Sequence, residues 1–337
     1  QVNCQGGSTN RRIPMQSLSS TQHRPAAREF GRFRRKACYR VASCSCPHAM
    51  NTTNHSSEFR RRDIRRRFDQ AADRFQEADF VHGVTREGLL ERLQPMTIDA
   101  ATVIDLGSAT GTAIPLLQKR FRGARVVAVD LSAAMLRVVR RKRTLLTRRY
   151  AVQADARSLP FADASIDVIF SNLMLPWIDD LDAVFAEVAR VLRKDGLFVF
   201  SSLGPDSLLE VREAWEAVDE GHHVNRFADM HVVGDALVRA GLRDPVLDVD
   251  PLSVSYRDPG ALFRDLTAAG ARNSLSNRQR GLMGRGRFRR FTDTLFSSGA
   301  DCSLTLELVY GHCWGSGVRR GSGEIMVDAG KIPLRRQ

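Results

Sequence analysis

Two short apolar strands, each carrying an aspartate at its end, constrain the fold of this chain more than any other feature. The first has Asp105 at its tip and is followed by a turn that contains Gly107 and Gly111. The second, residues 125–130, ends on an acid nineteen residues after Gly111. Glycine lets the backbone approach a ligand closely, and an acid after the second strand can bind both hydroxyls of a ribose. The pattern therefore predicts a nucleoside pocket at the carboxyl edge of a parallel sheet.

The spacing of the two glycines distinguishes among the nucleotide cofactors. The turn reads Gly-x-x-x-Gly, which is shorter than the Gly-x-Gly-x-x-Gly of dinucleotide-binding folds. It also lacks the Lys-Ser/Thr pair of a phosphate-binding loop. A pocket that binds ribose and adenine without cradling a pyrophosphate indicates S-adenosylmethionine, and we predict this cofactor.

Acids at the ends of the first three strands are the main candidates for cofactor contacts. Asp105 is placed to orient the turn or to bind the methionyl amino group. Asp130 is placed to bind the ribose diol. Ser132 can cap the next helix, so Asp130 is not needed for that role. Asp155 is placed to bind the exocyclic amine of adenine, although turn chemistry alone also explains it. The predicted cofactor-binding set is Asp105, Gly107, Ser108, Thr110, Gly111, Asp130, Leu131, Ser132, Met135, Asp155, Ala156, Asn172 and Leu173.

The apolar segment 171–177, after the fourth strand, is expected beside the methyl acceptor. Methyl transfer from a cation is accelerated by in-line positioning and by the exclusion of water. The segment lacks the Asn/Asp-Pro-Pro-Tyr/Phe run of nitrogen methyltransferases and the cysteine needed for attack on a pyrimidine. A carboxylate acceptor is already ionised at neutral pH and needs no general base. The acceptor-pocket candidates are Asn172, Trp177, Tyr310 and His312, although core packing explains Trp177, and a structural role His312, at least as well.

The alternation of strands and helices predicts a doubly wound, mostly parallel α/β sheet of seven strands. A helical region over 58–93, with a break near His82–Gly83, precedes the sheet. Helical stretches within 257–300 predict a lid insertion over the pocket, before a last strand at 304–310. The clearest strands are expected at 102–106, 125–130, 149–154, 166–171 and 197–201, and two extended segments at 245–250 and 252–256. Residues 58–317 are thus expected to form one domain.

The two ends of the chain differ from this domain in composition. Residues 1–49 contain nine Arg or Lys and one acid, and so carry about +8 of the formal charge of +13. We expect residues 1–57 to be a disordered basic extension outside the native fold, with a mitochondrial transit peptide as the alternative. Residues 318–337 are expected to be a flexible basic tail.

Cysteine usage and hydropathy limit the class of protein further. Cys44 and His48 have no second ligand pair at zinc spacing, so no metal site is expected. Cys302 and Cys313 fit a reducing compartment, and no apolar run is long enough to span a bilayer. We therefore expect a cytoplasmic protein without a membrane partner.

More narrowly, the chain resembles the malonyl-acyl-carrier-protein O-methyltransferases of biotin synthesis, a family of class I methyltransferases. The resemblance covers about residues 60–317. Its narrower segments are Gly-Pro-Asp-Ser-Leu at 204–208 and Arg-Phe-Ala-Asp-Met-His at 226–231. Further matching segments are 68–75, 105–111, 130–132, 155–156, 159–161, 171–173 and 309–314. Ser108 stands where the family usually has Cys, and Phe75 where Tyr is common.

The resemblance implies an enzyme that methylates the free carboxyl of a malonyl thioester on acyl carrier protein. The ester then allows fatty-acid synthesis enzymes to extend the chain toward pimeloyl. The implied cofactor is S-adenosylmethionine and the implied partner is an acidic carrier protein, which suits a basic lid.

Three alternatives remain open from the sequence. Mitochondrial complex I assembly factors of the same superfamily share the Gly-x-Asp-x-Leu segment and a similar tail, and some are thought to hydroxylate an arginine. A second alternative is a cofactor-binding assembly module without turnover. A third, less favoured, is an RNA methyltransferase with a phosphate track of arginines. That cluster comprises Arg278, Arg280, Arg285, Arg287, Arg289 and Arg290. The same arginines also suit a phosphopantetheine phosphate or an acidic carrier protein, and a solvated basic face explains most of them better.

Overall fold

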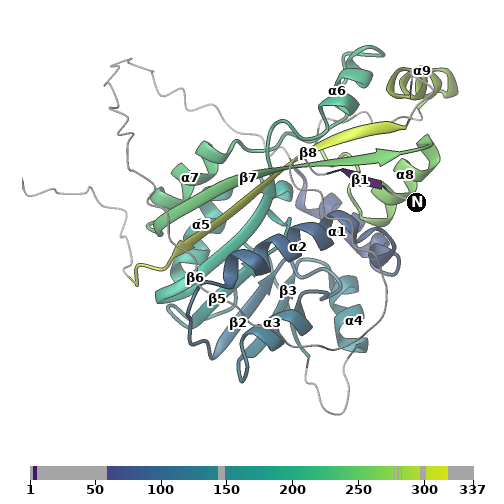
Figure 1. Cartoon of the computed structure of the whole chain (residues 1–337). Coiled ribbons are helices and arrows are strands. Elements are labelled where there is room, and N and C mark those ends of the chain that lie inside the picture. The colour runs from purple at the N-terminus through teal and green to yellow at the C-terminus, as the bar shows by residue number, and fades with distance from the viewer. Residues whose placement is uncertain are drawn as a thin grey trace, which may run out of the picture. The chain divides into compact units, whose positions relative to one another are not determined.

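An eight-stranded sheet is the centre of the fold (Figure 1). The computed structural model describes residues 3–5 and 59–317, except 143–148, 277, 279–280, 282 and 297–300. The strand order is β1-β7-β8-β6-β5-β2-β3-β4. The strands are β1 (Asn3–Gln5), β2 (Thr102–Leu106), β3 (Arg125–Asp130), β4 (Tyr150–Gln153), β5 (Ile166–Ser171), β6 (Leu192–Leu203), β7 (Arg243–Tyr256) and β8 (Cys302–Trp314).

The direction of the strands puts the ends of β2, β3 and β5 at one edge. The neighbouring strands from β4 to β6 run parallel, whereas β8 is antiparallel to both β6 and β7. Parallel strands that alternate with helices end at the same edge of the sheet, where ligands bind in folds of this kind. The predicted doubly wound, mostly parallel sheet is confirmed.

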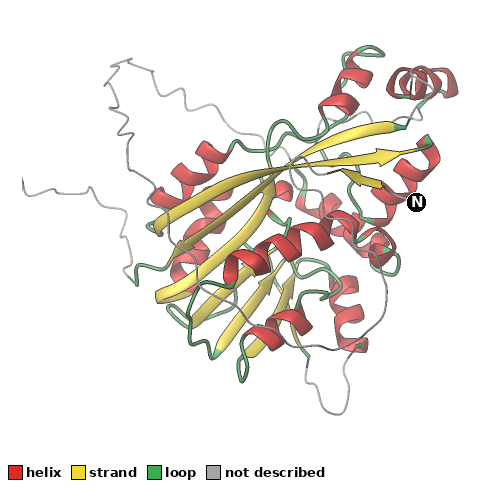
Figure 2. Ribbon diagram, viewed as in Figure 1, coloured by secondary structure: helices red, strands yellow, loops and turns green. Residues whose placement is uncertain are grey.

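Helices cover both faces of the parallel part of the sheet (Figure 2). Along β2, Val103 belongs to the core shared with α2, α3 and α4, and Ile104 to the core shared with α5 and α7. This division follows from the alternation of side chains along a strand. The helices are α1 (Arg61–Ala71), α2 (Phe80–Leu93), α3 (Ile114–Arg120), α4 (Ala133–Arg141), α5 (Leu181–Val191), α6 (Leu209–Glu216), α7 (Met230–Arg239), α8 (Pro259–Ala268) and α9 (Arg285–Leu295).

The long antiparallel strands β7 and β8 extend beyond the parallel strands, and α6, α8 and α9 gather around the extension (Figure 1). Trp215 of α6 stacks on Phe291 of α9 with ring centroids 4.0 Å apart. Both rings share one apolar cluster with Leu252 of β7 and Leu304 of β8. The helical insertion between β7 and β8 thus packs on the side of the strands where α6 lies.

Two local predictions differ from the structure. The opening helical region breaks at residues 72–79, where a 3₁₀ helix buries Phe75, and His82–Gly83 lies inside α2. No proline or glycine marks this break, so tertiary packing determines it. The two extended segments before residue 257 form the single strand β7, because β8 pairs with it along its length.

The amino-terminal region adds one element that was not predicted. Residues 3–5 form β1 and pair antiparallel with Ser253–Ser255 of β7. The outer edge of β7 offers unpaired backbone groups, which explains why a further strand pairs there. The rest of the predicted extension and tail, with Cys44 and His48, lies outside the described residues. Within the described part of the chain, no helix combines the length and apolarity needed to cross a membrane.

Candidate cofactor and acceptor site

The glycine turn after β2 adopts the conformation that its sequence predicts. Gly107 and Gly111 have φ angles of 74° and 73°, in the left-handed region that only glycine enters without strain. The backbone N–H groups of Gly107 and Ser108 donate to the carbonyl of Val129, which ties the turn to β3. A Cβ on Gly107 would lie 2.6 Å from the Cβ of Met174. The turn therefore needs glycine at position 107 for both backbone angle and space.

Gly107→Ala is expected to lower the free energy of unfolding by about 2–3 kcal/mol, since strain at positive φ and a clash add together. Gly123→Ala is the matched control, because its φ is 86° but no atom lies within 4 Å of the added Cβ. We expect the control to lower the free energy of unfolding, measured in urea, by only about 1–2 kcal/mol. Equal losses for the two variants would show that the contact with Met174 does not matter.

Asp130 lies at the end of β3, in the wall of a cavity beside the glycine turn. Its carboxylate accepts hydrogen bonds from the backbone N–H groups of Ala109 at 2.8 Å and Ser132 at 2.7 Å. Burial raises the pKa of Asp130 to about 6. As predicted, Ser132 caps α4, with its Oγ accepting from the N–H of Met135 at 3.2 Å. Each carboxylate oxygen keeps a lone pair free, so the geometry leaves Asp130 able to bind a diol.

Asp105 lies behind the glycine turn and is only 2 % exposed. Its Oδ2 is buried and accepts no hydrogen bond. Burial, and then the charge of Asp130, raise the pKa of Asp105 to about 7, against a smaller opposing effect of Arg86. An unsatisfied buried carboxyl oxygen is costly, so it indicates a ligand that supplies a cation or a donor.

The cavity at this edge encloses about 880 Å³, part of it open to solvent. Aromatic and apolar side chains, among them Phe68, Phe75 and Met174, form much of its wall. Of the residues predicted to bind the cofactor, the following line it: Gly107, Asp130, Leu131, Asp155, Ala156, Asn172 and Leu173. The other residues predicted to bind the cofactor do not line it: Asp105, Ser108, Thr110, Gly111, Ser132 and Met135. We call it the cofactor cavity.

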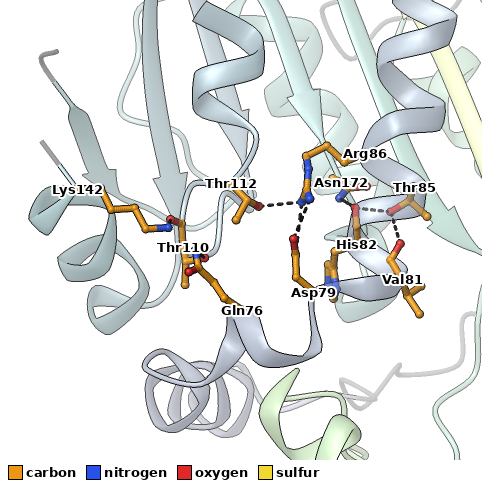
Figure 3. A network of polar contacts seen from close by, with 10 residues as sticks. All are labelled: Gln76, Asp79, Val81, His82, Thr85, Arg86, Thr110, Thr112, Lys142 and Asn172. Atoms are coloured by element: carbon orange, nitrogen blue, oxygen red, sulfur yellow. Dashed lines mark hydrogen bonds and ion pairs between the residues drawn. The ribbon is translucent and has the colours of Figure 1, made fainter. Parts of the chain in front are cut away.

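The helices before the sheet are held against the glycine turn by a polar network (Figure 3). Arg86 of α2 makes an ion pair with Asp79 at 2.8 Å and donates to Thr112 Oγ1 at 2.8 Å. Gln76 donates to Thr110 Oγ1 at 3.3 Å. The sequence interpretation missed these contacts, because nothing in the spacing of residues 76–86 relates them to the turn.

A second contact that the sequence did not reveal holds α1 to α4. Asp69 Oδ1 accepts from Ser132 Oγ at 2.6 Å and from the N–H of Ala134 at 3.2 Å. An acid at the start of α4 also suits the helix dipole. Asp69 thus holds α1 beside the cofactor cavity, where Phe68 lines the wall.

The segment after β5 connects the cofactor cavity to α2. Asn172 Oδ1 accepts from Ser201 Oγ at 2.8 Å. The Nδ2 of Asn172 donates to the carbonyl of His82 at 2.9 Å (Figure 3). Leu173 has a φ of 53°, which is strained for a leucine, and its N–H donates to Ser201 Oγ at 3.0 Å. Ser201 therefore fixes both residues where they line the cavity.

A second, larger cavity lies among α6, α8, α9, β7 and β8, and we call it the acceptor chamber. It encloses about 2020 Å³, part of it open to solvent, and its wall is mostly aliphatic and aromatic. His82, Leu173 and Trp177 line both this chamber and the cofactor cavity. Trp177 also packs edge-on against Phe68, with ring centroids 5.1 Å apart. The two spaces therefore meet at these three side chains.

His82 was not predicted as a site residue. Its ring packs edge-on against the ring of Phe75, with centroids 4.9 Å apart. Its Nδ1 is buried without a hydrogen-bond partner. Burial lowers the pKa of His82 to about 4, although Asp79 opposes the shift. The imidazole is therefore neutral at physiological pH. A neutral ring at the junction does not repel a cationic ligand in the cofactor cavity.

Asp155 and two acceptor candidates differ in their surroundings. Burial would raise the pKa of Asp155, but hydrogen bonds from Arg157 and Arg61 outweigh it and lower that pKa. The carboxylate therefore lines the cofactor cavity as an arginine-paired anion. Tyr310 and His312 line neither cavity: Tyr310 is buried beneath α2, with the Arg92 guanidinium 3.8 Å from its ring centroid. The antiparallel direction of β8 carries these two residues away from the acceptor chamber.

Comparisons with known proteins agree with this geometry. A family model described as "Methyltransferase domain" matches residues 104–200. The malonyl-[acyl-carrier protein] O-methyltransferase of Halorhodospira halophila is 40% identical over 285 residues, which cover 82% of this chain and 97% of that protein. The protein of the same name from a Methylovorus species is 42% identical over 259 residues, 74% of this chain and 88% of that protein. The chain belongs to this methyltransferase family.

A solved structure supports the fold alone. The YcgJ protein of Bacillus subtilis superposes with a TM-score of 0.51 at 17% identity, over 71% of this chain and all of that one. The enzyme is a class I methyltransferase, and S-adenosylmethionine is its methyl donor.

The residues of the cofactor cavity fit this donor. The carboxylate of Asp130 lines the cavity beside the turn, where the ribose is expected to bind. The unpartnered Oδ2 of Asp105 lies beneath the same turn, where a ligand ammonium would satisfy it. The apolar side chains suit adenine and the methylene groups. The glycine turn leaves room for this ligand without a phosphate cradle.

Proposed function

We propose that this methyltransferase transfers a methyl group to the free carboxyl of a malonyl thioester carried by acyl carrier protein, an early step of biotin synthesis. The observation that carries the proposal is the junction of two cavities at His82, Leu173 and Trp177. These are the described residues that line both spaces, so an acceptor in the large chamber would pass them to reach the cofactor cavity. The names of the relatives favour this substrate over the assembly-factor and RNA alternatives.

The chain's own residues then exclude water and position the reacting groups. S-adenosylmethionine supplies an electrophilic methyl group on its sulfonium sulfur, which leaves as a neutral thioether. Leu173 and Trp177 remove water from the junction, which strengthens the attraction between a carboxylate and a cation. Neutral His82 adds no positive charge there. A malonyl carboxylate is ionised at neutral pH, so no general base is required.

The test is mass spectrometry of malonyl-carrier protein after incubation with the enzyme and S-adenosylmethionine. We expect the mass of one methyl group to be added, and removed again by mild ester hydrolysis. Acetyl-carrier protein is the matched control, because it has the same arm and thioester without the free carboxyl. Methylation of both carriers, or of neither while S-adenosylmethionine binding is demonstrated, would refute the proposed acceptor.

A second prediction concerns the junction itself. Trp177→Ala is expected to lower kcat for malonyl-carrier protein by about 10- to 100-fold, because water enters and the acceptor is held less firmly. Binding of S-adenosylmethionine is expected to change much less, since many other residues line that cavity. Trp215→Ala is the comparison, because Trp215 lines only the acceptor chamber. Steady-state kinetics and calorimetry on both variants separate the two effects.

A further inference from the structure

Four arginines from two distant parts of the chain line a small polar cavity beside the acceptor chamber. Arg66 and Arg67 belong to α1, whereas Arg272 and Arg278 follow α8. The cavity encloses about 820 Å³, part of it open to solvent, and we call it the arginine cavity. The other described residues that line it are Asp63, Gln70, Ala71, Thr267 and Gly270.

The charges of the arginine cavity are not balanced among the described residues that line it. Asp63 is the one acid among the described residues of this wall, and it accepts from both terminal nitrogens of Arg278 at 3.2 Å. The Nη1 atom of Arg67 is buried and has no hydrogen-bond partner. Burial, and then repulsion by Arg278 and Arg272, lower the pKa of Arg67 to about 10. Guanidinium groups assembled in this way are stabilised by an anion that accepts several hydrogen bonds.

The arginine cavity adjoins the acceptor chamber along the chain segment 269–273. Ala269, Ala271 and Asn273 line the chamber, whereas Gly270 lines the arginine cavity. Arg272 lines both. Gly270 has a φ of 68°, and a Cβ there would lie 3.2 Å from Phe68, so glycine allows this segment to pass close to α1. A flexible ligand can therefore place an anionic group among the arginines and its apolar remainder in the chamber.

We propose that the arginine cavity binds the phosphodiester of the phosphopantetheine arm that carries the acceptor. The inference rests on the proposed function, because it assumes a thioester substrate on such an arm. A phosphodiester presents two non-bridging oxygens that share one negative charge, and this pair matches the planar donor pairs of arginine. The amide-linked arm would then pass Arg272 into the chamber and present its thioester end toward Trp177. The arginine cavity would bind the arm without contacting the methyl donor or the malonyl carboxylate.

The test uses Arg67→Gln and Arg66→Gln in the full chain, with two substrates. Malonyl-carrier protein contains the phosphodiester, whereas malonyl-pantetheine has the same thioester arm without phosphate. We expect each variant to raise KM for malonyl-carrier protein about tenfold or more, with kcat nearly unchanged. KM for malonyl-pantetheine should remain that of the unaltered enzyme. Arg65→Gln is the matched control, since Arg65 is exposed on the same helix and lines none of the three cavities.

Calorimetry provides a readout that does not depend on turnover. Phosphopantetheine is expected to bind the unaltered enzyme more tightly than pantetheine, and both glutamine variants should remove the difference. S-adenosylmethionine affinity, measured on every variant, reports whether the fold is intact. Arg66→Gln alters an exposed residue that lines the arginine cavity and neither of the other two, so it decides the matter if Arg67→Gln fails to fold.

Three results would overturn the inference. One is equal affinity for phosphopantetheine and pantetheine. Another is a rise in KM that is the same for both malonyl substrates. The third is that the glutamine variants bind apo-carrier protein, which lacks the arm, more weakly than the unaltered enzyme does, and by the same factor as they lose for holo-carrier protein. In that case the arginines would contact acidic side chains of the carrier. If no malonyl thioester is methylated while phosphopantetheine binding still depends on Arg67, the proposed function fails and the anion site remains.

Discussion

Asp130→Ala is expected to weaken binding of S-adenosylmethionine by about 10²- to 10⁴-fold. Two hydrogen bonds from the ribose hydroxyls to an ionised carboxylate contribute about 1.5–3 kcal/mol each, and the variant removes both. The same change leaves the backbone N–H groups of Ala109 and Ser132 without their acceptor, so the glycine turn also becomes less ordered. Titration calorimetry at pH 8, well above the pKa of about 6, measures the loss with the carboxylate fully ionised.

A matched control separates the cofactor contact from the structural one. Asp167 is also buried, and its carboxylate accepts from the N–H groups of Ala101 and Thr102 at 2.7 Å each, but at the opposite edge of the sheet. Asp167→Ala is therefore expected to reduce stability in urea without changing affinity for S-adenosylmethionine. If the two alanine variants lost affinity to the same extent, the assignment of Asp130 to the ribose would be wrong.

Asp105→Asn is expected to stabilise the cofactor-free enzyme at high pH. The pKa of Asp105 rises from 3.8 to about 7 in the folded chain, so the folded state binds the proton more tightly. The contribution of this group to stability is full below pH 4 and is lost as pH rises through 7. Asparagine cannot ionise, so its advantage over aspartate should grow by up to about 4 kcal/mol between pH 4 and pH 8. Urea unfolding of the unaltered enzyme and of Asp105→Asn from pH 4 to pH 8 measures this difference in the free energy of unfolding.

The same carboxyl is expected to couple cofactor binding to proton release. An ammonium beside Asp105 favours its ionised form, so the bound enzyme should hold fewer protons than the free enzyme near pH 6. Calorimetry in two buffers of different ionisation enthalpy counts the protons. Asp105→Asn should reduce the count but not abolish it, because Asp130 also titrates near pH 6. An unchanged proton count would show that Asp105 does not face a cation in the complex.

Local sequence determined the cofactor half of this enzyme. Residues 102–111 and 125–132 form a strand, turn and helix start from their own periodicity, glycine placement and capping chemistry. Parallel pairing of consecutive strands then brings their ends together with little freedom, so the sequence alone was enough to assign Gly107 and Asp130 to one pocket. Asn172 and Leu173 followed from the same rule, applied to the strand 166–171.

Tertiary packing alone decided the second cavity and the contacts that hold the first helices against the glycine turn. Asp69, His82 and Arg86 contact the cofactor region from helices whose spacing to the glycine turn is not encoded locally. The arginine cavity joins α1 to residues some two hundred positions later, which long-range contacts such as the ion pair between Asp63 and Arg278 bring together. Tyr310 and His312 line neither cavity, because their place depends on how far β8 runs along β6 and β7. Periodicity specifies which face of an element is buried, but long-range contacts choose the partner that covers it.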